Sequence, residues 1–257
     1  MLSVDKLSKQ LPDGTLLLDN LSFTAEAGEF IAILGASGAG KSLTLRCILG
    51  LTQATSGDIS FRDRDGFEHN LTTRNRRELR AARARLGTIF QGLNLVKGLR
   101  VVENVMLGRL GEIPPWRSWL IGFTDDEAFA AVDALAATNM AQHADRFTGS
   151  LSGGEMQRVA ISRAIYQQPD IYLADEPVSS LDPGNANAIM TLLRPLAEEK
   201  PVIGVFHQPD LVAKHCTRAI CIRKGRIVYD GAPQLDEATL TEIYGAELVK
   251  LREKDAA

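Results

Sequence analysis

Residues 30–42 read Phe-Ile-Ala-Ile-Leu-Gly-Ala-Ser-Gly-Ala-Gly-Lys-Ser, and this segment is the clearest indication of the fold. The apolar run Phe30–Leu34 predicts a buried strand, and helical character begins at Lys41 and lasts to a natural stop at Gly50. Between them the chain matches G-x-x-x-x-G-K-[ST] in full. Such glycines let backbone N–H groups turn inward around a polyphosphate, at the positive end of a helix dipole. A plain glycine turn would explain the glycines but not Lys41-Ser42, so we expect an α/β unit that binds phosphate.

The composition is that of a globular chain of 257 residues, of which 45% are hydrophobic and 24% charged. Its formal net charge of −3 offers no overall positive field to nucleic acid, which we do not expect as a partner. Three cysteines without CxxC spacing predict reduced thiols. No apolar run approaches the ~20 residues of a membrane span, and the first ten residues lack the apolar segment of a signal peptide. We therefore expect a cytosolic chain.

The strand and helix alternation returns late in the chain. Apolar runs at 171–174 and 202–206 predict strands, and Asp182 before Pro183 predicts the N-cap of the helix between them. Runs at 220–222 and 227–229 predict a closing hairpin.

The middle of the chain differs, because helical spacing dominates from about residue 93 to 165. Thr124 with Glu127 forms a capping box. The apolar face that we expect after it consists of Ala128, Phe129, Val132, Leu135 and Ala136. We interpret this block as a helical subdomain, at about 92–165, inserted into an α/β core made of 1–91 and 166–257 within one domain of residues 1–257.

Six arginines crowd the segment before the predicted insert: Arg74, Arg76, Arg77, Arg80, Arg83 and Arg85. They form either a surface for nucleic acid or anionic lipid, or a solvated helix face. We favour the solvated face, because the net charge is negative and Phe90 alone is near enough to stack on a base.

Two adjacent carboxylates, Asp175 and Glu176, end the apolar run 171–174. A charge at the end of a buried strand is costly unless something pairs with it. Next to a phosphate loop, we expect Ser42 and Asp175 to hold Mg²⁺, and Lys41 to neutralise the β- and γ-phosphates. Glu176 would then orient and deprotonate the attacking water.

The segment Leu151-Ser-Gly-Gly-Glu155 is the most specific motif in the chain. Ser152 and Glu155 have the spacing of an ordinary capping box. Two glycines weaken a first helical turn, but they suit a helix start that a phosphate approaches closely. The cap and a phosphate-binding role are therefore compatible.

Taken in order, the phosphate loop, Leu151–Glu155, Asp175-Glu176, Ser179–Asp182 and His207 resemble an ABC-transporter ATPase subunit over roughly residues 2–231. The resemblance implies a RecA-like P-loop α/β core with an antiparallel β subdomain and an inserted α-helical subdomain. It also implies ATP and Mg²⁺, and a head-to-tail homodimer that sandwiches two ATP molecules.

The resemblance also assigns roles to residues. The catalytic residues it implies are Glu176, the switch histidine His207 and Gln91, which senses the metal and the water. The metal site is then Ser42, Gln91 and Asp175. In trans, Ser152 and Gly154 touch the γ-phosphate and Asp182 belongs to the loop that contacts the other copy. The nucleotide site comprises Leu11, Gly35, Ala36, Ser37, Gly38, Ala39, Gly40, Lys41, Ser42, Leu43, Ser152, Gly153, Gly154 and Asp182.

The chain departs from the family pattern at two positions. Leu11 stands where an aromatic residue usually stacks on adenine, so aliphatic packing would replace stacking and weaken nucleotide affinity or base discrimination. Glu155 stands where glutamine is commoner, which keeps the helix cap but adds a negative charge near a phosphate site.

The insert Val102–Gly111, with Pro114–Trp119 and Gly122-Phe123 after it, resembles that of ATP-binding subunits of phosphonate importers, whose relatives take up phosphite. Trp116 and Trp119 could equally serve lobe packing. The resemblance implies integral membrane permease subunits docked beside Gln91, and a periplasmic or extracellular substrate-binding protein that acts through them. The chain would then be peripheral, on the cytoplasmic face of the bacterial inner membrane.

Other functions within the same family remain open. The chain could serve another ABC importer, or be a soluble ABC subunit of a phosphonate-degrading complex. ABC proteins of translation and DNA repair generally carry two ATPase units or long insertions, which this chain lacks. The segment Leu151–Glu155 and the helical insert exclude a generic P-loop kinase.

Overall fold

The computed structural model describes residues 1–111, 113 and 123–245, and its larger sheet has the strand order β10-β9-β3-β8-β7-β6. The pairs from β9 to β6 are parallel, and β9 with β10 forms the predicted antiparallel hairpin. The strands of this sheet are β3 Phe30–Leu34, β6 Leu86–Ile89, β7 Ile171–Asp175, β8 Val202–Val205, β9 Arg218–Arg223 and β10 Arg226–Gly231.

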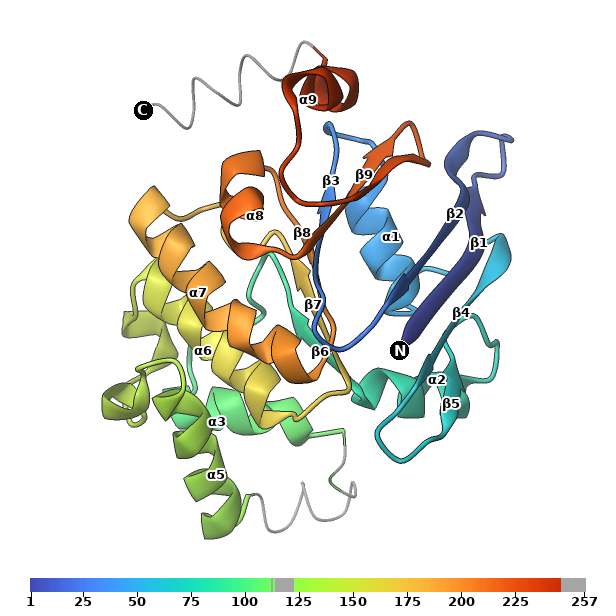
Figure 1. Ribbon diagram of the computed structural model, residues 1–257. Helices are drawn as coiled ribbons and strands as arrows, with labels where there is room; N and C mark the ends of the chain where they lie inside the picture. Colours follow the sequence, from blue (N-terminus) through green and yellow to red (C-terminus); the bar gives the residue numbers. More distant parts are fainter. Residues whose placement is uncertain (112, 114–122, 246–257) are drawn as a thin grey trace.

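A second, antiparallel sheet of order β2-β1-β4-β5 lies beside the first (Figure 1). Its strands are β1 Leu2–Gln10, β2 Leu16–Ala25, β4 Ser56–Arg62 and β5 Glu68–Asn70. From Leu21 to Ala25 alternate residues of β2 are buried, as expected where one face of a sheet packs on the core and the other meets water.

Helices cover both faces of the parallel sheet. The helix α1 (Lys41–Ile48) packs with Ile31 and Ile33 in one hydrophobic cluster, which also includes the inner face of the antiparallel sheet. Phe30, Ala32 and Leu34 point the other way, toward the helices on the opposite face. Those helices are α7 Pro183–Glu199, α8 Pro209–His215 and α9 Glu237–Tyr244. Burial on both faces explains why β3 is apolar at every position.

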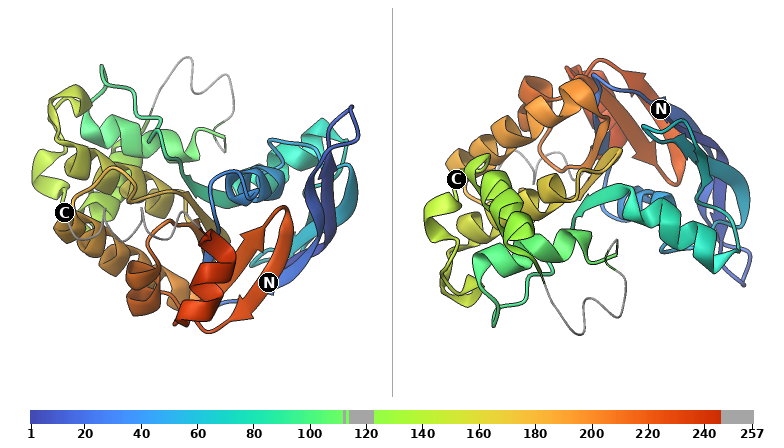
Figure 2. Two further views of the ribbon diagram at one scale, coloured as in Figure 1. Left: turned by 90° about the horizontal axis from the view of Figure 1, so that it is seen from above. Right: turned by 90° about the horizontal axis from the view of Figure 1, so that it is seen from below.

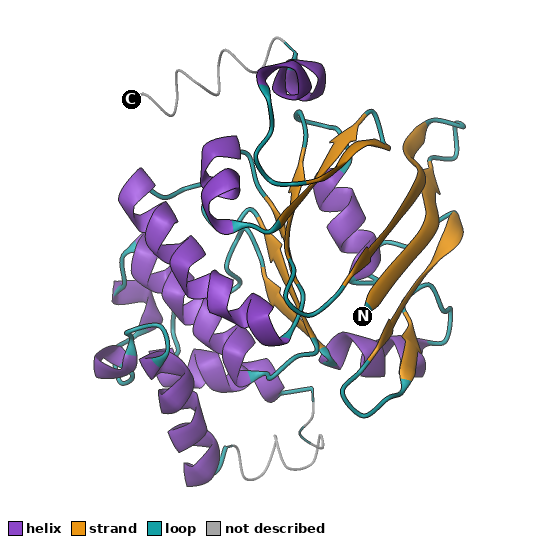
Figure 3. Ribbon diagram, in the orientation of Figure 1, coloured by secondary structure: helices purple, strands orange, loops and turns teal. Residues whose placement is uncertain are grey.

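A group of helices with its own hydrophobic cluster lies to one side of the strands (Figure 3). It contains α3 Val101–Met106, α5 Asp125–Ala136 and α6 Gly153–Tyr166, together with short 3₁₀ helices at Leu107–Arg109, Ala141–His143 and Thr148–Ser150. The α/β fold with an antiparallel sheet and added helices is therefore the predicted one. The predicted insert continues into residues 114–122, including Trp116 and Trp119, which lie outside the described residues.

The predicted apolar face of α5 is wrong in part. The capping box of Thr124 with Glu127 is present, but Phe129 is 71% exposed and Ala136 is also exposed. Leu135 is buried as predicted, and the other buried residues of the helix are Ala131 and Ala134. The small side chains of Ala131 and Ala134 allow α3 and α6 to approach α5 closely, and this packing sets which face of α5 is buried. The sequence pattern predicted burial of Phe129 because that side chain is larger and more apolar.

The arginine-rich segment contains α2 (Arg76–Ala84), and four of its six arginines are exposed, as either a solvated face or a binding surface requires. Arg83 is half-buried and donates from Nε to the Leu49 carbonyl at 2.9 Å. Arg85 donates to Asp65 at 2.8 Å. Arg83 therefore ties α2 to the end of α1, and Arg85 ties it to the turn between β4 and β5. No helix among the described residues is long and apolar enough to cross a membrane.

Candidate functional site

The phosphate loop joins β3 to α1 and adopts a backbone that only glycine tolerates well. Gly38 and Gly40 have φ of +73° and +109°. Lys41 is 5% exposed, and its ammonium donates to the carbonyls of Gly35 and Ala36 at 2.6 and 2.9 Å. Burial of an ammonium requires such partners, so the lysine spans the loop. The loop therefore surrounds a fixed positive charge.

The β9–β10 hairpin supports this loop from behind, which the sequence motif does not reveal. A Cβ on Gly35 would lie 2.2 Å from the carbonyl oxygen of Ile222, and the amide of Gly225 donates to the Ala39 carbonyl at 3.1 Å. The first glycine of the motif is thus needed for backbone packing.

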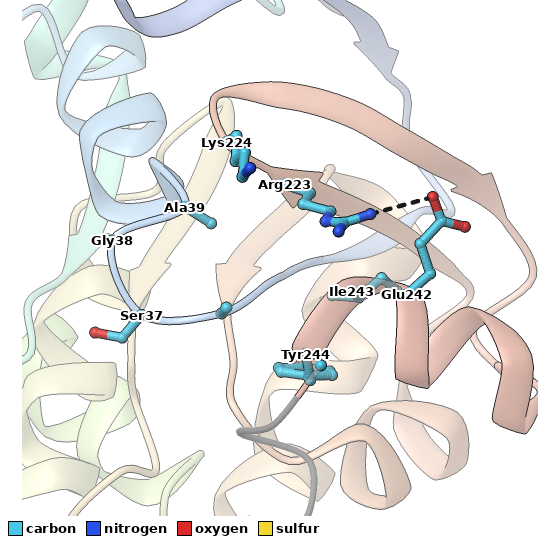
Figure 4. A pocket seen from close by; sticks show the side chains of 10 residues that line it. Ser37, Gly38, Ala39, Arg223, Lys224, Glu242, Ile243 and Tyr244 are labelled. Carbon is cyan, nitrogen blue, oxygen red and sulfur yellow. Dashed lines mark ion pairs between the residues drawn. The ribbon is translucent and has the colours of Figure 1, made fainter.

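A hollow of about 250 Å³ lies beside the loop, between the hairpin and α9 (Figure 4). Arg223 on the hairpin and Glu242 on α9 form an ion pair across it, with N···O at 3.6 Å. Ser37 and Gly38 contribute the opposite wall. No sequence signal connected α9 with the phosphate loop.

Ser42 and Asp175 meet at the start of α1 and the end of β7. The Ser42 hydroxyl donates to Asp175 Oδ1 at 3.0 Å. Burial raises the pKa of Asp175, the Ser42 hydrogen bond lowers it, and the charge of Glu176 raises it further. A carboxylate held this way is destabilised in its charged form unless a cation approaches.

These two oxygen donors fit Mg²⁺, which usually takes one or two carboxylates and completes its shell with water and substrate phosphates. The described residues contain no cluster of three or more His, Cys, Asp or Glu side chains that could hold a metal on their own. A site that needs the substrate's oxygens is therefore the kind that these residues can form.

Glu176, Gln91 and His207 form one hydrogen-bonded cluster. Gln91 Nε2 donates to Glu176 Oε2 at 2.8 Å, and His207 Nε2 lies 2.8 Å from Glu176 Oε1. The three residues follow β6, β7 and β8, which are neighbouring parallel strands that end at the same edge of the sheet. Parallel strand order therefore brings together side chains that lie 85 and 31 positions apart in the chain.

The backbone of Glu176 has φ +50°, which is unusual for a residue other than glycine. This conformation follows directly after the extended residue Asp175. As a result, Asp175 reaches Ser42 while Glu176 reaches Gln91 and His207, and the two adjacent carboxylates have separate partners. Strain of this kind often accompanies functional sites.

The segment Leu151–Glu155 starts α6 with a complete capping box. Glu155 accepts from the Ser152 amide at 2.7 Å and from its hydroxyl at 2.8 Å, and these bonds lower the pKa of Glu155. His143 and Arg146 also face Glu155, at 3.6 and 3.9 Å. The extra negative charge noted at Glu155 is therefore balanced locally.

The glycines of this segment remain accessible. A Cβ on Gly153 would meet nothing within 4 Å, and one on Gly154 would only touch Asn185 at 3.5 Å. Asn185 in turn donates to Asp182, the N-cap of α7, so the two helix starts are neighbours. Within the described chain, the Ser152 hydroxyl forms hydrogen bonds only with Glu155, and none of its hydrogen bonds reaches the phosphate loop.

The remaining predicted nucleotide residues lie at the edges of the site. Leu11 is 39% exposed in the turn that follows β1, where its amide donates to the Thr15 carbonyl. Leu43 is half-buried and packs on the core cluster around α1. Leu11 thus presents an apolar surface to solvent, whereas the Leu43 side chain mainly supports the helix.

Comparisons with known proteins agree with this geometry. The family model described as ABC transporter matches residues 18–179. The "Phosphonates import ATP-binding protein PhnC 1" of Ruegeria sp. (strain TM1040) is 42% identical over 235 residues, covering 91% of this chain and 90% of that protein.

Two solved structures of the cassette MJ0796 are similar in fold, both at 29% identity, 92% coverage of this chain and 100% coverage of theirs. The "Dimeric Structure of MJ0796, a Bacterial ABC Transporter Cassette" has a TM-score of 0.77. The dimeric post-hydrolysis state bound to ADP and Pi has a TM-score of 0.75. The family model spans well over half of the chain and agrees with these likenesses, so the chain belongs to the ABC transporter family as an ATP-binding cassette.

Proposed function

We propose that this chain is the ATP-hydrolysing subunit that powers an importer of phosphonates or phosphite. The observation that carries the proposal is the pairing of Ser42 with Asp175 beside the cluster of Gln91, Glu176 and His207. The phosphonate assignment follows the curated relative, an import ATP-binding protein at 42% identity.

In this proposal the ATP phosphates lie in the loop of residues 35–42. Lys41, already buried across the loop, neutralises the β- and γ-phosphates. Ser42, Asp175 and Gln91 hold Mg²⁺, which supplies positive charge to the phosphate oxygens. Leu11 packs against the adenine at the open edge, where an aliphatic side chain provides contact but no stacking.

Glu176 acts as the general base toward the attacking water. Its two carboxylate oxygens are held by Gln91 and His207, which fixes the direction of its lone pairs. Because a general base must lie within hydrogen-bond reach of the proton that it removes, this fixation is part of its activity. We assign to His207 a contact with the γ-phosphate and to Gln91 a contact with the water.

We further propose that two copies pair head to tail. The exposed start of α6 then supplies Ser152, Gly153 and Gly154 to the γ-phosphate of the partner copy, and Asp182 faces the partner. The accessible Gly153 and Gly154 and the dimeric MJ0796 cassette support this arrangement.

The permease subunits occupy the surface next to Gln91 in this proposal. A hollow of about 250 Å³ lies there. Its lining includes Phe90, which precedes the helical insert, and Gly108 and Arg163, which belong to the insert. We propose that residues 92–165 form a subdomain that moves against the core of 1–91 and 166–257. A substrate-binding protein would deliver cargo to the permease, and the chain would lie on the cytoplasmic face of the membrane.

The test is uptake by cells that lack this chain, complemented by wild type or by Glu176→Gln. Phosphonate, phosphite, phosphate and an amino acid are offered separately. We expect loss of phosphonate or phosphite uptake alone, rescued by wild type only. Unchanged uptake of all four, together with failure of the chain to fractionate with membranes when the permease is co-expressed, would favour a soluble ABC subunit.

A further inference from the structure

Four arginines of the arginine-rich segment have no structural task. Arg74, Arg76, Arg77 and Arg80 are exposed, and none forms an ion pair or a side-chain hydrogen bond within the described residues. The nearby acid Glu78 forms no ion pair with them, and its two oxygens accept from Asn75 and Thr73 instead. A concentrated positive surface thus exists on a chain of net charge −3.

The position of two of these arginines opposes local stability. Arg76 and Arg77 are the first two residues of α2, where the positive end of the helix dipole disfavours cations. The cap itself needs neither side chain, because Asn75 accepts from the backbone amide of Arg77. Two cations at a helix start, without a contact that compensates the unfavourable dipole, indicate that these arginines interact with something outside the folded chain.

The surface lies on a defined side of the molecule. A hollow lined by Arg80, Arg83 and Gly108 adjoins the one assigned above to the permease, and Gly108 and Gln167 line both. Viewed from below, α2 and α3 both lie on the face turned toward the viewer (Figure 2). If the permease docks there, this face is the one nearest the membrane.

We propose that Arg74, Arg76, Arg77 and Arg80 bind the anionic headgroups of the membrane surface, an inference that rests on the proposed permease docking. Headgroup phosphates are mobile and need only opposite charge, which suits arginines spread over a helix without a cleft. The centre of a protein interface usually combines arginine with aromatic or apolar side chains, and no large hydrophobic side chain is exposed on α2. Single-stranded nucleic acid is usually bound by stacking on aromatic side chains, which α2 lacks, and the net charge of −3 offers duplex nucleic acid no overall attraction.

The test measures binding of the full chain to vesicles of phosphatidylcholine, with or without phosphatidylglycerol. Each arginine near such a surface strengthens binding by about fivefold, so four together should favour anionic over neutral vesicles by a factor of roughly 10³. Arg74→Gln/Arg76→Gln/Arg77→Gln should weaken this preference by about 100-fold. This variant spares Arg80, which lines the hollow beside the permease site.

The matched control, Lys6→Gln/Arg194→Gln/Lys214→Gln, removes three exposed cations from β1, α7 and α8 and should bind like wild type. The α2 variant should also melt no lower than wild type, because it removes cations from a helix start. Equal loss in the control, or no preference for anionic vesicles, overturns the proposal. Tighter binding to an oligonucleotide, or loss of permease co-purification in detergent without any vesicle binding, assigns the surface to those partners instead.

The proposed ATPase function is tested separately in this experiment. Wild type and the α2 variant should hydrolyse ATP equally in solution without vesicles, since α2 contributes nothing to the cluster around Glu176. Absence of ATPase activity in wild type would refute the proposed function whatever the vesicles show.

Discussion

Replacing Glu176 by glutamine separates the proposed base from the contacts that hold it. A glutamine can keep both neighbours, because its oxygen accepts from Gln91 while its amide donates to a His207 ring whose Nε2 carries no proton. The carboxylate oxygens now make these two contacts at 2.8 Å each. Size and hydrogen bonding are retained, so we expect the free energy of unfolding to change by less than about 1 kcal/mol.

The rate should respond very differently. A positioned general base contributes about 10²–10⁴-fold, which corresponds to about 3–5 kcal/mol of activation free energy. We expect kcat for phosphate release to fall by that factor. ATP binding uses the loop of residues 35–42 and is untouched, so light scattering should show an ATP-bound dimer that persists.

The control is Glu198→Gln, the same change at an exposed position of α7, which should leave kcat and melting temperature unchanged. Hydrolysis by Glu176→Gln near the wild-type rate would show that the base assignment is wrong. Loss of activity together with a lower melting temperature and lost ATP binding would show that Glu176 is structural.

Three further substitutions test the site and its support. Burial raises the pKa of Asp175, so the native chain holds that proton more tightly than the unfolded chain, and stability declines as pH rises from the ordinary Asp value through the raised one. Asp175→Asn should therefore melt higher than wild type at pH 7 without nucleotide yet lose hydrolysis, and an unchanged melting temperature would contradict the burial argument. Gly35→Ala should cost more than about 3 kcal/mol in urea unfolding, because its Cβ meets the Ile222 carbonyl, whereas Gly28→Ala, also at positive φ but in open space, should cost about 1 kcal/mol. Ser152→Ala removes the α6 cap and should lower stability by about 1 kcal/mol, and a fully retained ATP-driven dimer would argue against its contact with phosphate in trans.

Local signals predicted local structure well in this chain. The strand, glycine loop and helix around residues 30–42, the capping boxes of α5 and α6, and the Asp182 cap of α7 all depend on a few adjacent residues. Such signals act through backbone hydrogen bonds within one turn, so a single sequence contains them.

Packing between distant elements was less predictable. The rotation of α5 depends on how closely α3 and α6 approach it, and the pattern alone selected Phe129 instead of Ala131 and Ala134. The support of the phosphate loop by the β9–β10 hairpin depends on the strand order of the sheet, since β9 pairs with β3. Likewise, the motif names Gln91, Glu176 and His207, but only parallel neighbours β6, β7 and β8 bring their side chains within 2.8 Å.

The end of β7 shows how the fold gives two adjacent acids different tasks. Two neighbouring carboxylates repel each other, and the charge of Glu176 adds to the burial that already raises the pKa of Asp175. A regular strand would project the two side chains to opposite faces of the sheet, and helices cover both of these faces. The turn at Glu176, with φ +50°, instead keeps its carboxylate at the open edge, where Gln91 and His207 reach it. Backbone strain at one residue therefore leaves Asp175 available to a cation beside Ser42 and Glu176 available to water.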